Sequence, residues 1–281
     1  MPTAAGSSSE PPVSYSLPRT NAKVLALLEP SLATARRILD IGAGEGYLAS
    51  RVRDLIARKG YRAQLEACDL FPDNFRVPDV PCHAINLQGG LPLPDQNFDL
   101  AYSVEVLEHL EDQFLFFREV HRILRPGGRL VLTTPNVLSL TSRVRTLLAG
   151  FPELFGPLPL RGDDPQHVGG HIHPVSVYFI AYMAEKAGLH ITSCSTDRVK
   201  AGSLGLLVLW PLVKLASAIV AMHARRKTPD IVAENRQHLA RMNSFAILTG
   251  RTVILEMVRR PDSHVAQPRA TVAPGSASHE P

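Results

Sequence analysis

A short glycine-rich segment, residues 40–46, carries residue types suited to holding a ligand. It reads Asp-Ile-Gly-Ala-Gly-Glu-Gly, follows an apolar run and precedes a helical pattern. Glycines in that context allow a tight turn and a close approach of the backbone to a ligand. Asp40 and Glu45 flank the glycines with negative charge, which repels a pyrophosphate and favours a cationic ligand. A turn that only packs is the alternative interpretation.

A second group of reactive residue types, Glu-Val-Leu-Glu-His, occupies residues 105–109. It follows an apolar run, 98–103, that predicts a strand. Ligands of open α/β sheets bind at the carboxyl ends of the strands, so we expect Glu105, Glu108 and His109 beside the glycine-rich segment. An imidazole suits general-base work near neutral pH, and a histidine that only caps or packs is equally compatible with the pattern.

A histidine-rich string, His-Val-Gly-Gly-His-Ile-His-Pro, occupies residues 167–174. The spacing of His171 and His173 can ligate a metal, but no cysteine or acid cluster completes a zinc set. A structural turn is a further interpretation of the same glycine- and proline-rich string.

The elements that must position these residues alternate along residues 37–136. Short apolar runs alternate there with helical patterns, which predicts βαβ units and a Rossmann-like, mostly parallel sheet. The strand candidates are 37–41, 64–70, 82–87, 98–103, 129–134 and 189–195. The helix candidates are 47–58, 112–124, 137–148 and 174–187, and a turn at 125–128 ends the second of them. A β-rich run, 245–258, is expected to close the sheet edge as an antiparallel strand.

Four segments together resemble class I S-adenosylmethionine-dependent methyltransferases, among them ubiquinone-pathway and envelope-polysaccharide enzymes. They are the glycine-rich segment, the string 91–110, Arg-Pro-Gly-Gly at 125–128 and Thr-Thr-Pro-Asn at 133–136. The resemblance covers about residues 38–136. It implies the cofactor S-adenosylmethionine, whose sulfonium and ammonium suit the acidic glycine-rich segment.

The resemblance also assigns residues at the ends of the strands. Asp69 matches the family's acid that accepts hydrogen bonds from the ribose hydroxyls. Asn86 stands where the family commonly has an Asp near the adenine amino group, a departure that keeps an acceptor oxygen. His171 and His173 lie in a Gly-His-Ile-x-Pro-like element that implies an acceptor-binding role. The implied cofactor-binding residues are Asp40, Gly42, Gly44, Gly46, Asp69, Leu70, Asn86, Leu87 and Ser103.

Methyl transfer is an in-line displacement at an activated carbon, so the protein supplies proximity, orientation and, for a hydroxyl acceptor, a base. We expect transfer to oxygen of a small or lipid-like acceptor, with His109, Glu108 and Glu105 as the catalytic residues. Transfer to carbon or nitrogen in quinone or natural-product synthesis is an alternative, and so is a non-catalytic cofactor-binding scaffold. No metal is expected, although some relatives with a Glu-x-x-Glu-His pattern use a divalent ion to lower the pKa of a hydroxyl.

Residues 204–222 form an apolar stretch close to the length of a membrane span, interrupted by Pro211 and Lys214. The interruptions disfavour a true span. Trp210 and the basic run 225–227 suit a headgroup interface. We expect residues 204–227 to contact a membrane peripherally or to cover a lipidic acceptor; a buried helix pair and a dimer face are the alternatives.

Length and composition set the outer limits. A chain of 281 residues that is 45% hydrophobic suits one α/β domain, expected at 19–260 with an acceptor-binding cap at about 137–244. The segments 1–18 and 261–281, rich in small and polar residues, are expected to be disordered. A net charge of +4 does not demand nucleic acid, and three cysteines make no disulfide framework. The absence of a signal-like start predicts a cytoplasmic protein, with contact to the inner face of the membrane through 204–227; the oligomeric state is left open.

Overall fold

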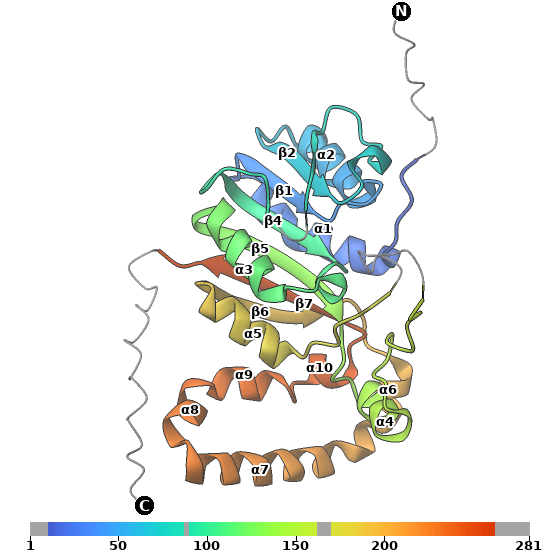
Figure 1. Ribbon diagram of the computed structural model, residues 1–281, viewed down its shortest axis with the longest axis vertical. Helices are drawn as coiled ribbons and strands as arrows, with labels where there is room; N and C mark the ends of the chain where they lie inside the picture. Colours follow the sequence, from blue (N-terminus) through green and yellow to red (C-terminus); the bar gives the residue numbers. More distant parts are fainter. Residues whose placement is uncertain (1–10, 87–89, 162–169, 262–281) are drawn as a thin grey trace, which may run out of the picture.

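The computed structural model describes residues 11–86, 90–161 and 170–261. Within these ranges seven strands form one sheet in the order β3-β2-β1-β4-β5-β7-β6 (Figure 1). The strands are β1 (Arg37–Ile41), β2 (Gln64–Asp69), β3 (Cys82–Ala84), β4 (Phe98–Val104), β5 (Leu124–Pro135), β6 (Leu189–Thr196) and β7 (Thr252–Arg259). All neighbouring pairs from β3 to β5 are parallel, and β7 is antiparallel to both β5 and β6.

The predicted fold class, a Rossmann-like mostly parallel sheet with antiparallel pairing at its edge, is confirmed. The antiparallel strand itself lies one place in from the edge, because β6 pairs outside it. The order of the strands reverses between β1 and β4, since the chain first builds outward through β2 and β3 and then returns to the other side of β1. Such a switch point opens a crevice at the carboxyl ends of the two strands, where open α/β sheets bind ligands.

Helices cover both faces of the sheet (Figure 1). On one face α1 (Pro18–Leu32) and α2 (Tyr47–Lys59) bury a cluster with Ile38 of β1 and Leu100 of β4. On the other face α3 (Gln113–Ile123), α5 (Val177–Lys186) and α10 (Phe245–Thr249) pack with β4, β5, β6 and β7. The side chain of Asp112 caps α3 by accepting a hydrogen bond from the Leu115 N–H at 2.7 Å. The helices therefore fix both faces of the sheet, and the loops at its carboxyl edge are left for ligands.

Several boundaries differ from the expectations. The run 245–258 begins as helix α10, and its strand starts only at Thr252. The turn at 125–128 lies inside β5, as an irregularity between the Phe98–Leu124 and Leu100–Arg129 pairs. Residues 11–18 were expected in a disordered tail, but they hydrogen-bond to the glycine-rich segment and begin α1. The expected tail residues 1–10 and 262–281 lie outside the described ranges.

The region expected to form a cap, 137–244, divides between the sheet and a separate helical layer. Strand β6 and helix α5 belong to the sheet and its cover. The remaining helices gather beyond the β6 edge, at the lower end of Figure 1. They are α4 (Leu140–Ala149), α6 (Ala201–Gly205), a 3-10 turn (Leu206–Leu209), α7 (Trp210–Lys227), α8 (Pro229–Glu234) and α9 (Arg236–Arg241).

Candidate active site

The glycine-rich segment forms the turn between β1 and α2. Gly42, Gly44 and Gly46 all have positive φ values, of 75°, 55° and 92°. A Cβ on Gly42 would lie 2.4 Å from Val106 Cγ2, and one on Gly46 would lie 2.4 Å from Val77 Cγ2. The Gly42 N–H donates to the Cys68 carbonyl at 2.8 Å, which joins the turn to β2. Glycine is therefore required here both by the backbone conformation and by the close packing.

Asp69, at the end of β2, organises the same turn. Its Oδ2 accepts a hydrogen bond from the Gly44 N–H at 2.8 Å, and its Oδ1 accepts one from the Phe71 N–H at 2.9 Å. Each carboxylate oxygen can accept a second bond. Asp69 can thus hold the glycine turn and still accept from a ligand hydroxyl.

Asp40 is buried at the end of β1, with 4% of its surface exposed. Burial, and next to it the negative charge of Asp69, raise the pKa of Asp40 to about 8. The ionised form of such a carboxyl group is unfavourable in the free protein. A ligand that brings a positive charge stabilises this ionised form.

The chain before α1 covers the glycine turn from outside. Glu45 accepts hydrogen bonds from the Val13 N–H at 3.0 Å and from the Tyr15 hydroxyl at 3.1 Å. The bond from Val13, ahead of the one from Tyr15, lowers the pKa of Glu45. A Cβ on Gly44 would lie 3.2 Å from the Tyr15 ring, so this ring lies directly on the turn. The sequence interpretation missed these residues; the signal available was an aromatic and an apolar residue within a stretch otherwise rich in Ser and Pro.

These segments surround a pocket of about 640 Å³, which is within the size range of small-molecule sites. The described residues that line it come from the carboxyl ends of β1, β2 and β4, from residues 13–16, and from Ile85, His171 and Arg251. Among the predicted site residues, Asp40, Gly42, Gly44, Asp69, Leu70, Glu105, His109 and His171 line this pocket.

Glu105, His109 and His171 line the pocket, and Glu108 lies buried beside the two histidines, whose ring centroids are 5.0 Å apart. Glu108 is fully buried; its Oε2 accepts a bond from the Thr134 hydroxyl at 3.0 Å, whereas its Oε1 has no hydrogen-bond partner in the described part of the chain. Burial raises the pKa of Glu105 and of Glu108, and the charge of Glu105 raises that of Glu108 further. Glu105 also has a φ of 56°, in the left-handed region, which is energetically unfavourable for a residue that has a Cβ.

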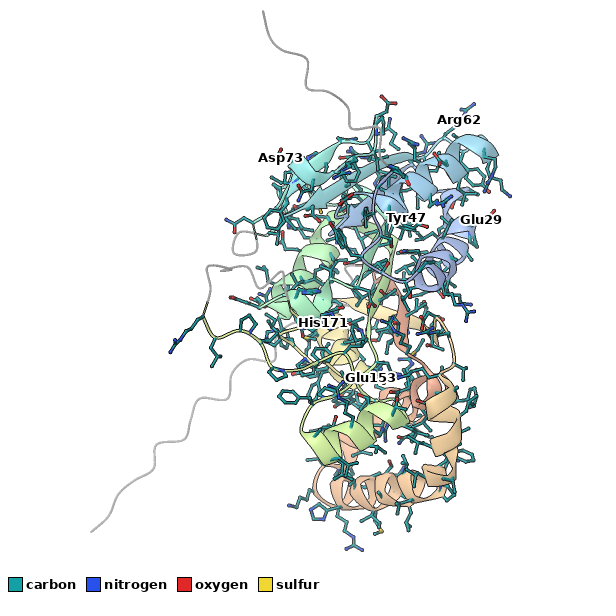
Figure 2. All side chains as sticks on the ribbon, turned by 90° about the vertical axis from the view of Figure 1, so that its right-hand side faces the viewer. Glu29, Tyr47, Arg62, Asp73, Glu153 and His171 are labelled. Carbon is teal, nitrogen blue, oxygen red and sulfur yellow. The ribbon has the colours of Figure 1, made fainter. Side chains whose placement is uncertain are left out.

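The imidazole rings of His109 and His171 lie beside the Glu108 carboxylate, and hydrogen bonds at Nδ1 define the tautomer of each ring. Nδ1 of His109 is 2.8 Å from the Gly170 carbonyl, and Nδ1 of His171 is 2.9 Å from the Leu154 carbonyl. A carbonyl only accepts, so each Nδ1 carries a proton, and in the neutral form of either ring the lone pair is on Nε2. Burial lowers the pKa of His171, which keeps this ring neutral. Figure 2 shows His171 between Tyr47, at the start of α2, and Glu153, beside α4.

A family described as "Methyltransferase domain" matches residues 14–194, well over half of the chain. The chain is a class I S-adenosylmethionine-dependent methyltransferase. It is 39% identical over 101 residues to a probable S-adenosylmethionine-dependent methyltransferase of Mycolicibacterium smegmatis, covering 36% of this chain and 38% of the relative. It is 33% identical over 122 residues to malonyl-[acyl-carrier protein] O-methyltransferase of Halorhodospira halophila, covering 40% of this chain and 39% of that protein. The chain thus spans about two fifths of the length of these curated relatives.

Among solved structures, the chain is similar to that of a complex between the Haloferax volcanii Trm112 methyltransferase activator and a methyltransferase. The TM-score is 0.50 at 17% identity, with 86% of this chain and 89% of that chain covered. This likeness concerns the fold alone, and it agrees with the sheet of this methyltransferase.

Five described predicted site residues of the methyltransferase are not among those that line the pocket: Gly46, Asn86, Ser103, Glu108 and His173. The hydroxyl of Ser103 is fully buried and donates to the Ile41 carbonyl at 3.0 Å, so it ties β4 to β1. His173 bonds through Nδ1 to the Leu110 carbonyl at 2.6 Å and is not among the residues that line the pocket. Asn86 forms an isolated bridge with Gly90 rather than a pocket wall. Leu87 lies outside the described residues.

Residues expected to cover a lipidic acceptor are also remote from this pocket. None of the described residues that line it belongs to the stretch 204–227. No residue of α7 is buried, so a buried helix pair does not account for that stretch in this chain.

The acid and histidine cluster offers two kinds of chemistry to the methyltransferase. A neutral imidazole Nε2 can take a proton from an acceptor. One ligand atom from each of Glu108, His109 and His171 also lies within 4.8 Å of the other two. Two imidazoles and a carboxylate make a donor set that suits a divalent transition-metal ion.

Proposed function

We propose that this methyltransferase transfers its methyl group to an oxygen of a small or lipid-like acceptor that carries a hydroxyl. The observation that supports oxygen is the imidazole of His109, held through Nδ1 by the Gly170 carbonyl at the wall of the pocket that the glycine turn opens into. Attack by a hydroxyl requires the loss of a proton, whereas a neutral amine is already a nucleophile. Malonyl-[acyl-carrier protein] O-methyltransferase and the O-methyltransferase cnsE of Penicillium expansum are relatives whose names specify oxygen.

S-adenosylmethionine supplies a methyl carbon activated by its sulfonium, and the departing sulfur takes the bonding electrons. The residues that would hold this cofactor are the glycine turn through its backbone, Asp69, which would accept from the ribose hydroxyls, and Asp40, whose carboxylate would favour the ligand's positive charge. His109 Nε2 takes the proton of the acceptor hydroxyl as the new carbon–oxygen bond forms. The carboxylate of buried Glu108 would stabilise the imidazolium formed on His109, because the ligand atoms of Glu108 and His109 lie within 4.8 Å of each other.

The test uses S-adenosylmethionine with a ¹³C-labelled methyl group and extracts that contain phenolic and lipid alcohols. We expect a product whose labelled carbon has the chemical shift of a methoxy group. His109→Gln should lower kcat by about 100-fold or more, the usual contribution of a general base, with little change in cofactor affinity. His83→Gln, in a partly exposed histidine of β3, is the matched control. A labelled methyl on nitrogen or carbon overturns the proposal.

A divalent ion is a second route to the same product, favoured by the three close ligand atoms. An ion held by Glu108, His109 and His171 would lower the pKa of an acceptor hydroxyl, and His109 would then be a ligand. Calorimetric titration with Mn²⁺ separates the two routes. Saturable binding that Glu108→Gln abolishes assigns activation to an ion; no binding, with O-methylation intact in the presence of a chelator, assigns it to His109 as the base.

A further inference from the structure

The stretch from α6 to α7 is an apolar helical segment whose most apolar part is left exposed. Residues Ala201–Lys227 are helical over 27 residues, long and apolar enough to cross a membrane, with a mean hydropathy of 2.1 in their most apolar window. None of that window is buried. We refer to Ala201–Lys227 as the apolar arm. Figure 1 shows its helix α7 along the end of the molecule opposite β2.

The apolar arm exposes large side chains on more than one side. Leu212, Leu215, Ile219 and Met222 follow helical spacing along one stripe, and each exposes more than half of its surface. Val208 and Val220 are exposed to 79% and 68%. A helix that is apolar all round normally lies in a protein core or in lipid, and contiguous exposed apolar patches mark interaction surfaces.

The charged residues within the apolar arm are all of one sign. No Asp or Glu occurs between Asp197 and Asp230. Arg225, Arg226 and Lys227 are exposed at the end of α7, and Lys214 lies over the ring of Trp210 at 4.2 Å. Exposed cations beside apolar side chains match anionic headgroups above hydrocarbon, and Trp210 suits the boundary between the two. A second copy of the arm would offer these cations no anion.

We propose that the apolar arm lies in the interfacial layer of an anionic phospholipid bilayer and holds this methyltransferase at the membrane surface. The inference does not depend on which atom the enzyme methylates.

The connections of the arm show why it lies on the bilayer rather than across it. Its start, α6, packs against α4 and α10, and its end returns through α8 and α9 to α5. Both ends are therefore joined to one body of the protein. A span would separate these ends by a hydrocarbon core of about 30 Å, which the shared body does not allow.

The test exploits the fact that the chain contains a single tryptophan, Trp210. Its fluorescence reports the arm alone. The full-length protein is titrated with phosphatidylglycerol-containing vesicles and with pure phosphatidylcholine vesicles, with and without lipids brominated on their acyl chains. We expect a blue shift and bromine quenching with the anionic vesicles, weakened by added salt.

Two sets of substitutions locate the binding. Replacing Arg225, Arg226 and Lys227 by Gln should weaken anionic-vesicle binding by roughly 100-fold, at about a fivefold loss for each cation. Leu215→Glu with Ile219→Glu should abolish bromine quenching. Phe179→Glu, at an exposed apolar residue of α5, is the matched control and should bind like the wild type. Unchanged calorimetric binding of S-adenosylmethionine shows that each variant is folded.

The outcomes distinguish the occupants of the arm. Anionic-vesicle binding that the arm variants lose and Phe179→Glu keeps supports the proposal. A Trp210 spectrum that no vesicle changes overturns it, and a dimer in sedimentation that Leu215→Glu with Ile219→Glu dissociates would assign the arm to a second copy instead. Quenching that persists at equal strength on neutral vesicles overturns the anionic-headgroup part of the proposal.

Discussion

Asp40→Asn should stabilise the ligand-free protein at alkaline pH while it weakens cofactor binding. Burial raises the pKa of Asp40 from 3.8 to about 8, so the folded protein holds a proton on this carboxyl that the unfolded chain releases above pH 4. Stability therefore falls as the pH rises from about 4 to about 8. At 1.36 kcal/mol for each pH unit, the loss due to Asp40 between pH 5 and pH 7.5 is roughly 3 kcal/mol.

Urea unfolding at several pH values measures this loss as the difference in unfolding free energy between the wild type and Asp40→Asn. Glu105 and Glu108 titrate in both proteins, so their contributions largely cancel. We expect the variant to gain roughly 3 kcal/mol relative to wild type over that range, and Asp54→Asn, at an exposed ion pair of α2, to gain nothing. Calorimetry should show proton release when wild type binds S-adenosylmethionine at pH 7, and none from this group in Asp40→Asn. Stability curves that stay parallel across the range would refute the reasoning.

Three further predictions follow from the site. In urea unfolding, Gly46→Ala should lower the free energy of unfolding by about 3 kcal/mol or more, because the added Cβ would lie 2.4 Å from Val77. Gly60 also has a positive φ, but a Cβ there would meet nothing within 4 Å, so Gly60→Ala should cost only about 1 kcal/mol. Tyr15→Ala should raise the Kd for S-adenosylmethionine, measured by calorimetry, by about 3- to 10-fold, because roughly 1 kcal/mol of ring contact is lost. The unfolding free energy should change by no more than about 0.5 kcal/mol. An unchanged Kd would contradict a ring that covers the cofactor. Glu108→Gln should stabilise the protein at pH 9 by more than 1 kcal/mol, since it removes a buried carboxylate whose Oε1 has no hydrogen bond in the described chain, and should lower kcat. Equal stability at pH 9 would count against the burial of that charge.

The sheet was predictable because its strands carry their own signal. The runs 37–41 and 98–103 are apolar on both faces, as parallel strands between two helical layers must be, and the structure gives β1 and β4 at these positions. The run 245–258 misled because a short apolar segment reads alike as a strand or as a buried helix. Its first residues form α10, capped by the Ser244 hydroxyl.

The site was predictable where a residue's place in the chain also decides its place in space. Asp40 and Asp69 lie at the carboxyl ends of strands that pair side by side, so the sheet itself brings them together. Tyr15 and Arg251 reach the pocket from segments far from β1 in the chain, and no periodicity reports such an approach. Ser103 shows the converse: it ends a strand at the right edge, but its side chain points into the sheet and bonds Ile41.

The pocket and the apolar arm both carry groups that are energetically unfavourable in the free protein, and they differ in what can offset that cost. In and beside the pocket, the buried Asp40 and Glu108 and the partly buried Glu105 have raised pKa values, a cost that a cationic ligand or a proton transfer can offset. At the apolar arm the unfavourable groups are hydrocarbon side chains in water, a cost that only an apolar environment can offset. The pocket lies among the loops at the carboxyl edge of the sheet, and the arm lies beyond α4 and α10 at the end of the molecule. Variants of the arm should therefore change where the enzyme resides without changing its affinity for S-adenosylmethionine.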